Sequence, residues 1–111
     1  MKMLFLGAII GPLVISSGTF ADSTLIDQGR RVYVANCLRC HNIDPNENGS
    51  VGPQIVDAPY EVMYSKIMTG KYPDPLPAGF VPKRTSKAMK PLQGLKDDIP
   101  AIFEYVKSVK K

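Results

Sequence analysis

The chain has 111 residues and carries a net charge of +4 at neutral pH, with 44% hydrophobic and 22% charged residues. This length suits one small domain, and the mild positive charge is far from the strongly basic balance of nucleic-acid-binding domains. Two cysteines and one histidine are too few for a structural zinc site, which needs four ligands of these types. We therefore expect neither a nucleic-acid partner nor structural zinc.

The first 21 residues have the pattern of a cleavable export signal. A short basic start precedes an apolar run over 4–15, and small residues near Ala21 fit a signal peptidase site. The run is shorter than the about 20 apolar residues that span a bilayer, and a Gly-Pro pair interrupts it. We expect a signal peptide over 1–21 and one mature domain over 22–111.

Hydrophobic periodicity and helix end signals predict three helices in the mature domain. The first covers 25–36 and leads directly into the cysteines. The second covers 60–69, between a proline and a glycine, and the third runs from about residue 97 to the C-terminus. Prolines and turn residues fill the connections. The predicted fold class is all-α with long loops.

Both cysteines and the only histidine fall in one pentapeptide, Cys37-Leu38-Arg39-Cys40-His41. Cys-x-x-Cys-His is typical of c-type haem attachment: each thiol adds to one vinyl group, and the histidine supplies an axial ligand to the iron. A thioredoxin-like pair would need a neighbouring βαβ pattern, and a disulfide between Cys37 and Cys40 would close a very short loop that stabilises little. We therefore expect one covalently bound haem c.

Residues on both sides of this motif resemble the class I c-type cytochromes, which are small all-α proteins with one haem and His/Met-ligated iron. Gly29 and Tyr33 stand where that family has a small residue and an aromatic residue on its N-terminal helix. Ile102 and Tyr105 stand where its last helix has the apolar and aromatic partners. The resemblance implies a cytochrome c fold, in which these two helices cross over the haem and a glycine lets their backbones approach closely.

The resemblance also gives a role to Pro53, which follows Gly52 after a polar loop rich in turn residues. Alone, a Gly-Pro pair is an ordinary turn signal. In the family the proline carbonyl accepts a hydrogen bond from the histidine nitrogen that faces away from the iron, which fixes the ring plane and raises its basicity. We assign this role to Pro53 toward His41.

The sixth position of the iron must hold a methionine or a lysine or stay open, because the chain has no second histidine. Met63 and Met68 lie on the second predicted helix, where methionine is most often a core residue. Met89 lies in an extended segment before the last helix and resembles the family's Met-Pro ligand loop, with one residue inserted between the methionine and the proline. We expect Met89 to be the axial ligand, with Met63 and Met68 as alternatives and Lys87 and Lys90 after them.

A His/Met pair fills both axial positions, so oxygen and peroxide have no place to bind. With the resemblance, this predicts a carrier of single electrons and not an enzyme. Two alternatives stay open: the cytochrome subunit of a larger exported oxidoreductase, and a five-coordinate haem sensor or peroxidase if Met89 does not ligate. Because bacteria attach c-type haems outside the cytoplasm, the export signal agrees with the motif, and we expect a periplasmic protein.

Positive charge gathers around the predicted ligand loop and the haem motif. The residues are Lys83, Arg84, Lys87, Lys90 and Arg39. An ordinary solvated loop would explain them equally well, but such charges also steer acidic partners, at rates that fall as salt rises. We expect redox partner proteins with acidic docking surfaces and no stable membrane span after signal cleavage.

Overall fold

A computed structural model describes residues 17–111, with side chains from residue 23 onward. Its elements are α1 (Ser17–Asn36), α2 (Tyr60–Thr69), the 3-10 helix η1 (Gln93–Asp98) and α3 (Ile99–Ser108). Within the described residues there is no strand, which confirms the all-α class. Residues 1–16 of the expected signal peptide lie outside the described residues, and its expected cleavage site after Ala21 lies within the helix α1 and stays a prediction.

The helix ends agree with the sequence to different degrees. α2 has the predicted bounds, because Pro59 precedes it and Gly70 ends it in the left-handed conformation at φ 75°. α1 begins at Ser17 and not near residue 25, since residues 19–28 contain no glycine or proline to stop it and an Asp-Ser-Thr run only favours a helix start. The last helix begins at Ile99 after the turns of η1 and ends at Ser108, before the C-terminus.

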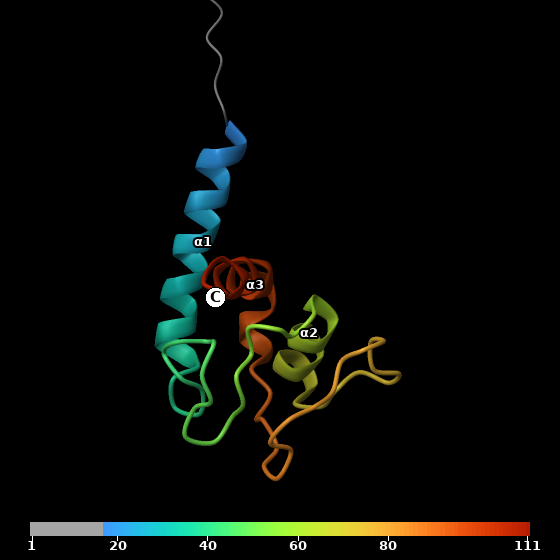
Figure 1. Ribbon diagram of the computed structural model, residues 1–111. Helices are drawn as coiled ribbons and strands as arrows, with labels where there is room; N and C mark the ends of the chain where they lie inside the picture. Colours follow the sequence, from blue (N-terminus) through green and yellow to red (C-terminus); the bar gives the residue numbers. More distant parts are fainter. Residues whose placement is uncertain (1–16) are drawn as a thin grey trace, which may run out of the picture.

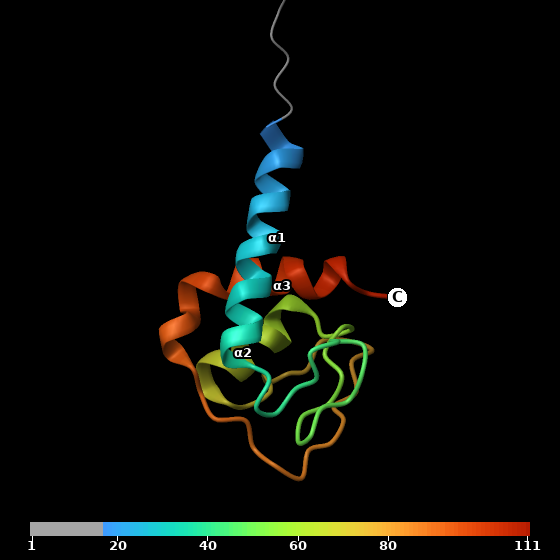
Figure 2. The same cartoon turned by 90° about the vertical axis from the view of Figure 1, so that its left-hand side faces the viewer.

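α1 and α3 pack against one another, and α3 runs across α1 (Figures 1 and 2). Their backbones approach closely at Gly29, where an added Cβ would lie 1.9 Å from the carbonyl oxygen of Ala101. Tyr33 and Tyr105 meet beside it, with ring centroids 5.7 Å apart. The predicted packing of these two helices is confirmed, and a glycine is required where they touch.

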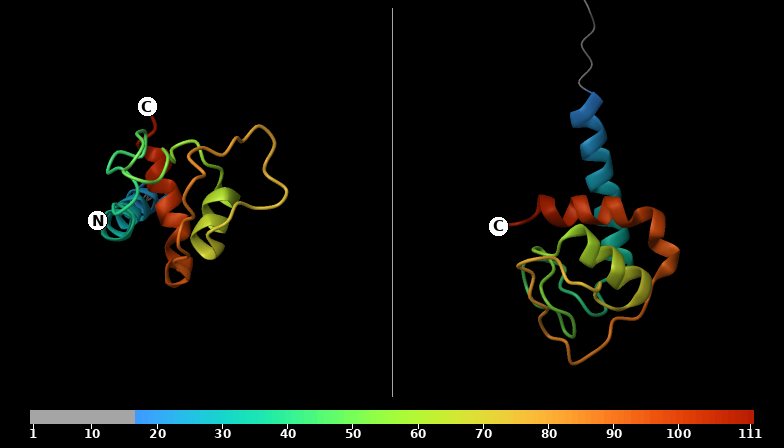
Figure 3. Two further views of the ribbon diagram at one scale, coloured as in Figure 1. Left: turned by 90° about the horizontal axis from the view of Figure 1, so that it is seen from below. Right: turned by 90° about the vertical axis from the view of Figure 1, so that its right-hand side faces the viewer.

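The core lies where α1, α2 and α3 converge. Its fully buried large side chains are Tyr33, Ile99, Ile102 and Val106. α2 packs on η1 and α3, while the connection between α2 and η1 makes a long excursion beside α2 (Figure 3). This arrangement leaves one side of the core to be closed by loops. Among residues 17–111, no helix is both long and apolar enough to span a bilayer.

The C-terminus is tied to the loop that follows the cysteine motif. The Asn46 side-chain amide donates to the carbonyl of Val109 at 2.9 Å and its oxygen accepts from the Lys111 backbone N–H at 3.1 Å. The Lys111 ammonium also lies 3.0 Å from the Asp44 carboxylate. Hydrogen bonds from Asn46, with a smaller effect of Lys111, lower the pKa of Asp44 to about 2. These contacts hold the end of the chain on the loop.

Candidate functional site

The cysteine motif forms a tight turn at the end of α1. The Cys37 N–H donates to the Tyr33 carbonyl at 2.9 Å, and the His41 N–H donates to the Cys37 carbonyl at 2.9 Å, so helical bonding continues into the motif. Both Cys37 and Cys40 are free thiols and partly exposed. Burial raises the pKa of Cys37 to about 11, whereas redox-active thiols of the thioredoxin type have lowered pKa values. The environment of Cys37 therefore argues against a redox dithiol.

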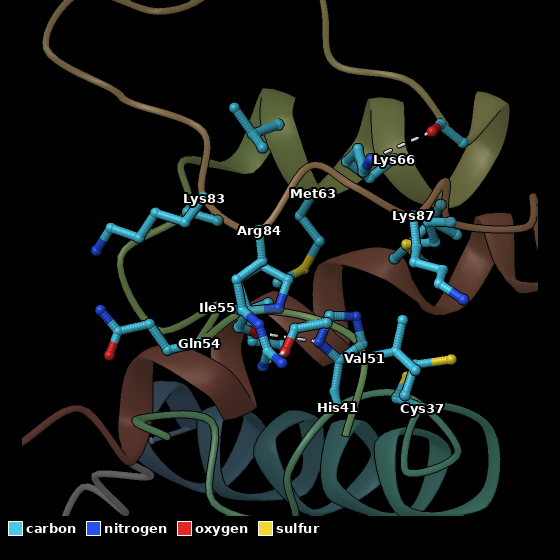
Figure 4. A pocket seen from close by; sticks show the side chains of 18 of the residues that line it. Cys37, His41, Val51, Gln54, Ile55, Met63, Lys66, Lys83, Arg84 and Lys87 are labelled. Carbon is cyan, nitrogen blue, oxygen red and sulfur yellow. Dashed lines mark hydrogen bonds between the residues drawn. The ribbon is translucent and has the colours of Figure 1, made fainter. Parts of the chain in front are cut away.

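A cavity of about 1140 Å³ opens behind this turn. Its walls come from the end of α1 with the motif, residues 51–58, α2 and residues 80–92. Figure 4 shows α2 with Met63 and Lys66 on one side, and Cys37 and His41 on the other. Small-molecule and cofactor sites usually have about 300–1,000 Å³, so the cavity is large enough for a cofactor of the size of a haem.

His41 lines this cavity, and its ring contacts the backbone of the segment that follows Gly52. Its Nδ1 lies 3.2 Å from the carbonyl oxygen of Pro53 (Figure 4), and because that oxygen can only accept, Nδ1 carries the hydrogen. Burial lowers the pKa of His41, which favours the neutral ring, and Nε2 then has a free lone pair. The structure thus contains the contact that the resemblance implies for Pro53.

Gly52 makes this placement of the ring possible. An added Cβ at Gly52 would lie 2.4 Å from Cε1 and 2.6 Å from Nδ1 of His41. Arg84 fixes the same turn, because its guanidinium donates to the carbonyls of Gly49 at 2.7 Å and Gly52 at 3.0 Å. The sequence left Arg84 open between partner docking and an ordinary solvated loop; in the structure it ties the 80–92 segment to the turn beside His41.

The three candidate methionines are in different places. Met63 and Met89 line the cavity, whereas Met68 is a partly buried residue at the edge of the core and does not line it. Met63 is 6% exposed and belongs to the core itself, while Met89 lies on the loop wall. Lys87 and Lys90 also line the cavity. The structure therefore brings Cys37, Cys40, His41 and Met89 around one space.

The cavity has a strongly positive lining. All five basic residues that the sequence singled out line it, and so do Lys66 and Lys71, which the sequence reasoning missed.

Lys66 is the more enclosed of these two additional lysines. Its ammonium donates to the Gly70 carbonyl at 3.2 Å and lies 4.2 Å from the centre of the Tyr72 ring, and burial lowers the pKa of Lys66. The one feature of the sequence that could have predicted Lys66 in the lining is its position three residues after Met63, on the same face of the helix. Among the described lining residues the single acidic one is Asp57, so the cavity suits a ligand with negative groups.

Comparisons of the chain with protein-family models, with curated proteins and with solved structures found no match in any of the three. In the described part of the chain, no three or more His, Cys, Asp or Glu side chains are grouped so that they could hold a metal ion. The functional argument therefore depends on the cavity and on the residues around it.

Proposed function

We propose that the protein carries single electrons through one haem c, bound covalently in this cavity as in class I c-type cytochromes. The observation that carries the proposal is that Cys37, Cys40, His41 and Met89 all line one cofactor-sized cavity. Thiols, an imidazole and a thioether are the donor set that haem c takes, and the positive lining suits its two carboxylates. The residues present therefore fit this group.

Each side chain of the donor set has a separate task. Cys37 and Cys40 would hold the group through thioethers, in which each sulfur adds to one carbon of a vinyl group and the thiol hydrogen goes to the other. His41 offers Nε2 to the iron, and Pro53 holds its Nδ1–H and keeps the ring plane fixed. Met89 offers its sulfur from the loop wall. A bound haem supplies a one-electron couple between ferrous and ferric iron.

The protein then limits the chemistry to electron transfer. A thioether ligand favours ferrous iron, and an apolar wall disfavours the additional charge of ferric iron, so both raise the reduction potential. With His41 and Met89 both bound to the iron, no position would be left for oxygen. This distinguishes the carrier from a five-coordinate sensor or peroxidase. Membership in a larger exported oxidoreductase complex is the second candidate, and elution size in the presence of partner proteins separates the two. For either, the motif and the export signal support a periplasmic location.

The ligand assignment is tested with two methionine variants of the haem-loaded protein. Met89→Ala should abolish the far-red methionine–iron absorption band of the ferric form and lower the reduction potential. Met68→Ala is the matched control, because Met68 does not line the cavity and should keep the band. If the band survives in Met89→Ala, Met89 is not the axial ligand. Met63→Ala then decides whether the other methionine of the cavity takes that place.

A further inference from the structure

The segment that carries Met89 is fastened to the C-terminal end of α2. The Leu92 N–H donates to the Ile67 carbonyl at 2.7 Å, and the Gln93 side-chain amide donates to the Met68 carbonyl at 3.1 Å. Both carbonyls belong to the last turn of the helix, where no intrahelical partner is available. The candidate ligand loop is therefore docked on a helix end at fixed points on its C-terminal side.

The closest contact at this junction is between the backbones of Gly70 and Met89. Gly70 has a φ of 75°, and an added Cβ would lie 2.3 Å from the carbonyl oxygen of Met89 and 3.3 Å from Cδ of Pro91. Real Cβ atoms do not approach a backbone oxygen that closely, so a side chain at position 70 would force Gly70 and Met89 apart. Gly70 thus has two separate reasons to be a glycine: its own dihedral angle and the nearness of Met89.

We propose that Gly70 is a positioning residue for Met89: the absence of its side chain sets how deep the methionine backbone can lie against α2, and so places the sulfur for the iron. This inference rests on the proposed function. Functional side chains generally need positions within about 0.5 Å of the productive geometry. A Cβ at position 70 requires the contact between Gly70 and Met89 to open, and the neighbouring hydrogen bonds at Leu92 and Gln93 restrict how the Met89 segment can adjust.

The chain offers a matched control at Gly79. Gly79 has a φ of 83°, nearly that of Gly70, but an added Cβ there has no heavy atom within 4 Å. Alanine therefore has to adopt a similar positive φ at both positions, and it clashes with Met89 at only one of them. The difference between Gly70→Ala and Gly79→Ala isolates the contact with Met89 from the cost of the left-handed conformation.

The experiment compares both variants as haem-loaded mature proteins. The readouts are the far-red methionine–iron band, the reduction potential and the affinity of ferric protein for added imidazole. Gly70→Ala should weaken the band and bind imidazole about tenfold more tightly or better, because a displaced Met89 leaves the sixth position open for a larger fraction of the time. Gly79→Ala should match the wild type in all three, although both variants melt at a lower temperature.

Two outcomes would overturn the proposal: an unchanged band and imidazole affinity in Gly70→Ala, or equal changes in Gly79→Ala. If Gly70→Ala does not accumulate, the pair Gly70→Asn and Gly79→Asn replaces it, because asparagine tolerates a positive φ but still has a Cβ. Failure of the proposed function is distinguishable, because the band is then absent from the wild type or survives in Met89→Ala.

Discussion

At the scale of single residues, the surroundings of His41 determine what the site can do. Its Nδ1 lies against the carbonyl of Pro53, and the bare backbone of Gly52 lies close to the ring. Replacing Pro53 keeps a carbonyl at that position, since every residue has one. A Pro53 variant should therefore shift the reduction potential modestly and leave the helix content nearly unchanged. An unchanged potential would count against a role of Pro53 in orienting His41.

Gly52→Ala should have a larger effect than a Pro53 variant. Its Cβ would meet the His41 ring at 2.4 Å, so the ring has to turn or shift, and overpacking of this kind costs about 1–3 kcal/mol of stability. We expect a lower melting temperature and a shifted reduction potential in the haem-loaded variant. Gly94→Ala is the control, because no heavy atom lies within 4 Å of its added Cβ. Equal potentials in the two variants would show that Gly52 does not support the ring.

The residues of the site were predictable from sequence to different degrees. The motif places both thiols and the imidazole together by covalent proximity alone. Met63 and Met68 are five residues apart on one helix and so lie on different faces, but no pattern in the sequence shows which face meets the cavity. Lys66 was missed because a lysine on an amphipathic helix is normally a solvated residue.

At the scale of elements, the crossing of α1 and α3 forms the frame of the site, because α1 leads directly into Cys37. The sequence predicted the bounds of α2 correctly, since proline and glycine mark both ends. It did not predict where α1 begins, because the Asp-Ser-Thr run is compatible with a helix start and with a helix interior. The loop contacts of Gly70 and Arg84 link residues far apart in the chain, and no local signal predicts such contacts.

Gly29→Ala tests the crossing. Alanine is the better helix former by about 1 kcal/mol, so propensity alone predicts a more stable protein. The contact at 1.9 Å from the Ala101 carbonyl predicts the opposite, a net loss of about 1–2 kcal/mol, because two helix backbones have to separate. Chemical denaturation measures the difference, with Gly94→Ala again as the control. A stabilised Gly29→Ala would contradict the close packing of α1 and α3.

At the scale of the whole molecule, the C-terminal contacts with Asp44 make stability depend on pH. The pKa of Asp44 is about 2 in the folded protein, below the ordinary value of about 3.9. The group therefore stabilises the fold above about pH 4, and this contribution is lost as the pH falls toward 2.

Asp44→Asn should melt at a lower temperature at neutral pH and should lose less stability than the wild type between pH 4 and 2. Melting temperatures across that range measure both effects. Asp74→Asn changes an exposed carboxylate on the other loop and should keep the wild-type profile. If the melting temperature of Asp44→Asn depends on pH as that of the wild type does, Asp44 does not cause the loss of stability at low pH.

The positive charge around the cavity should also affect how fast charged electron donors and acceptors approach the protein. Electron transfer from ferrocyanide, an anion, should slow as salt rises, whereas a cationic cobalt complex should show the opposite trend. Lys87→Glu should slow the ferrocyanide reaction several-fold in haem-loaded protein. Lys96→Glu makes the same charge change at a residue that does not line the cavity and should have a smaller effect. Equal effects of the two variants would show that the net charge of the protein, and not the charge around the cavity, attracts ferrocyanide.

The central claim is that Cys37 and Cys40 attach one haem, and its most direct test is the mass of the chain after denaturation. The protein is produced in bacteria with haem-attachment machinery, unfolded in acid and weighed by mass spectrometry. We predict the mass of one mature chain, residues 22–111, plus one haem, and the bare mature chain when both cysteines are replaced by alanine. A wild-type chain that has the bare mass under these conditions would contradict the account.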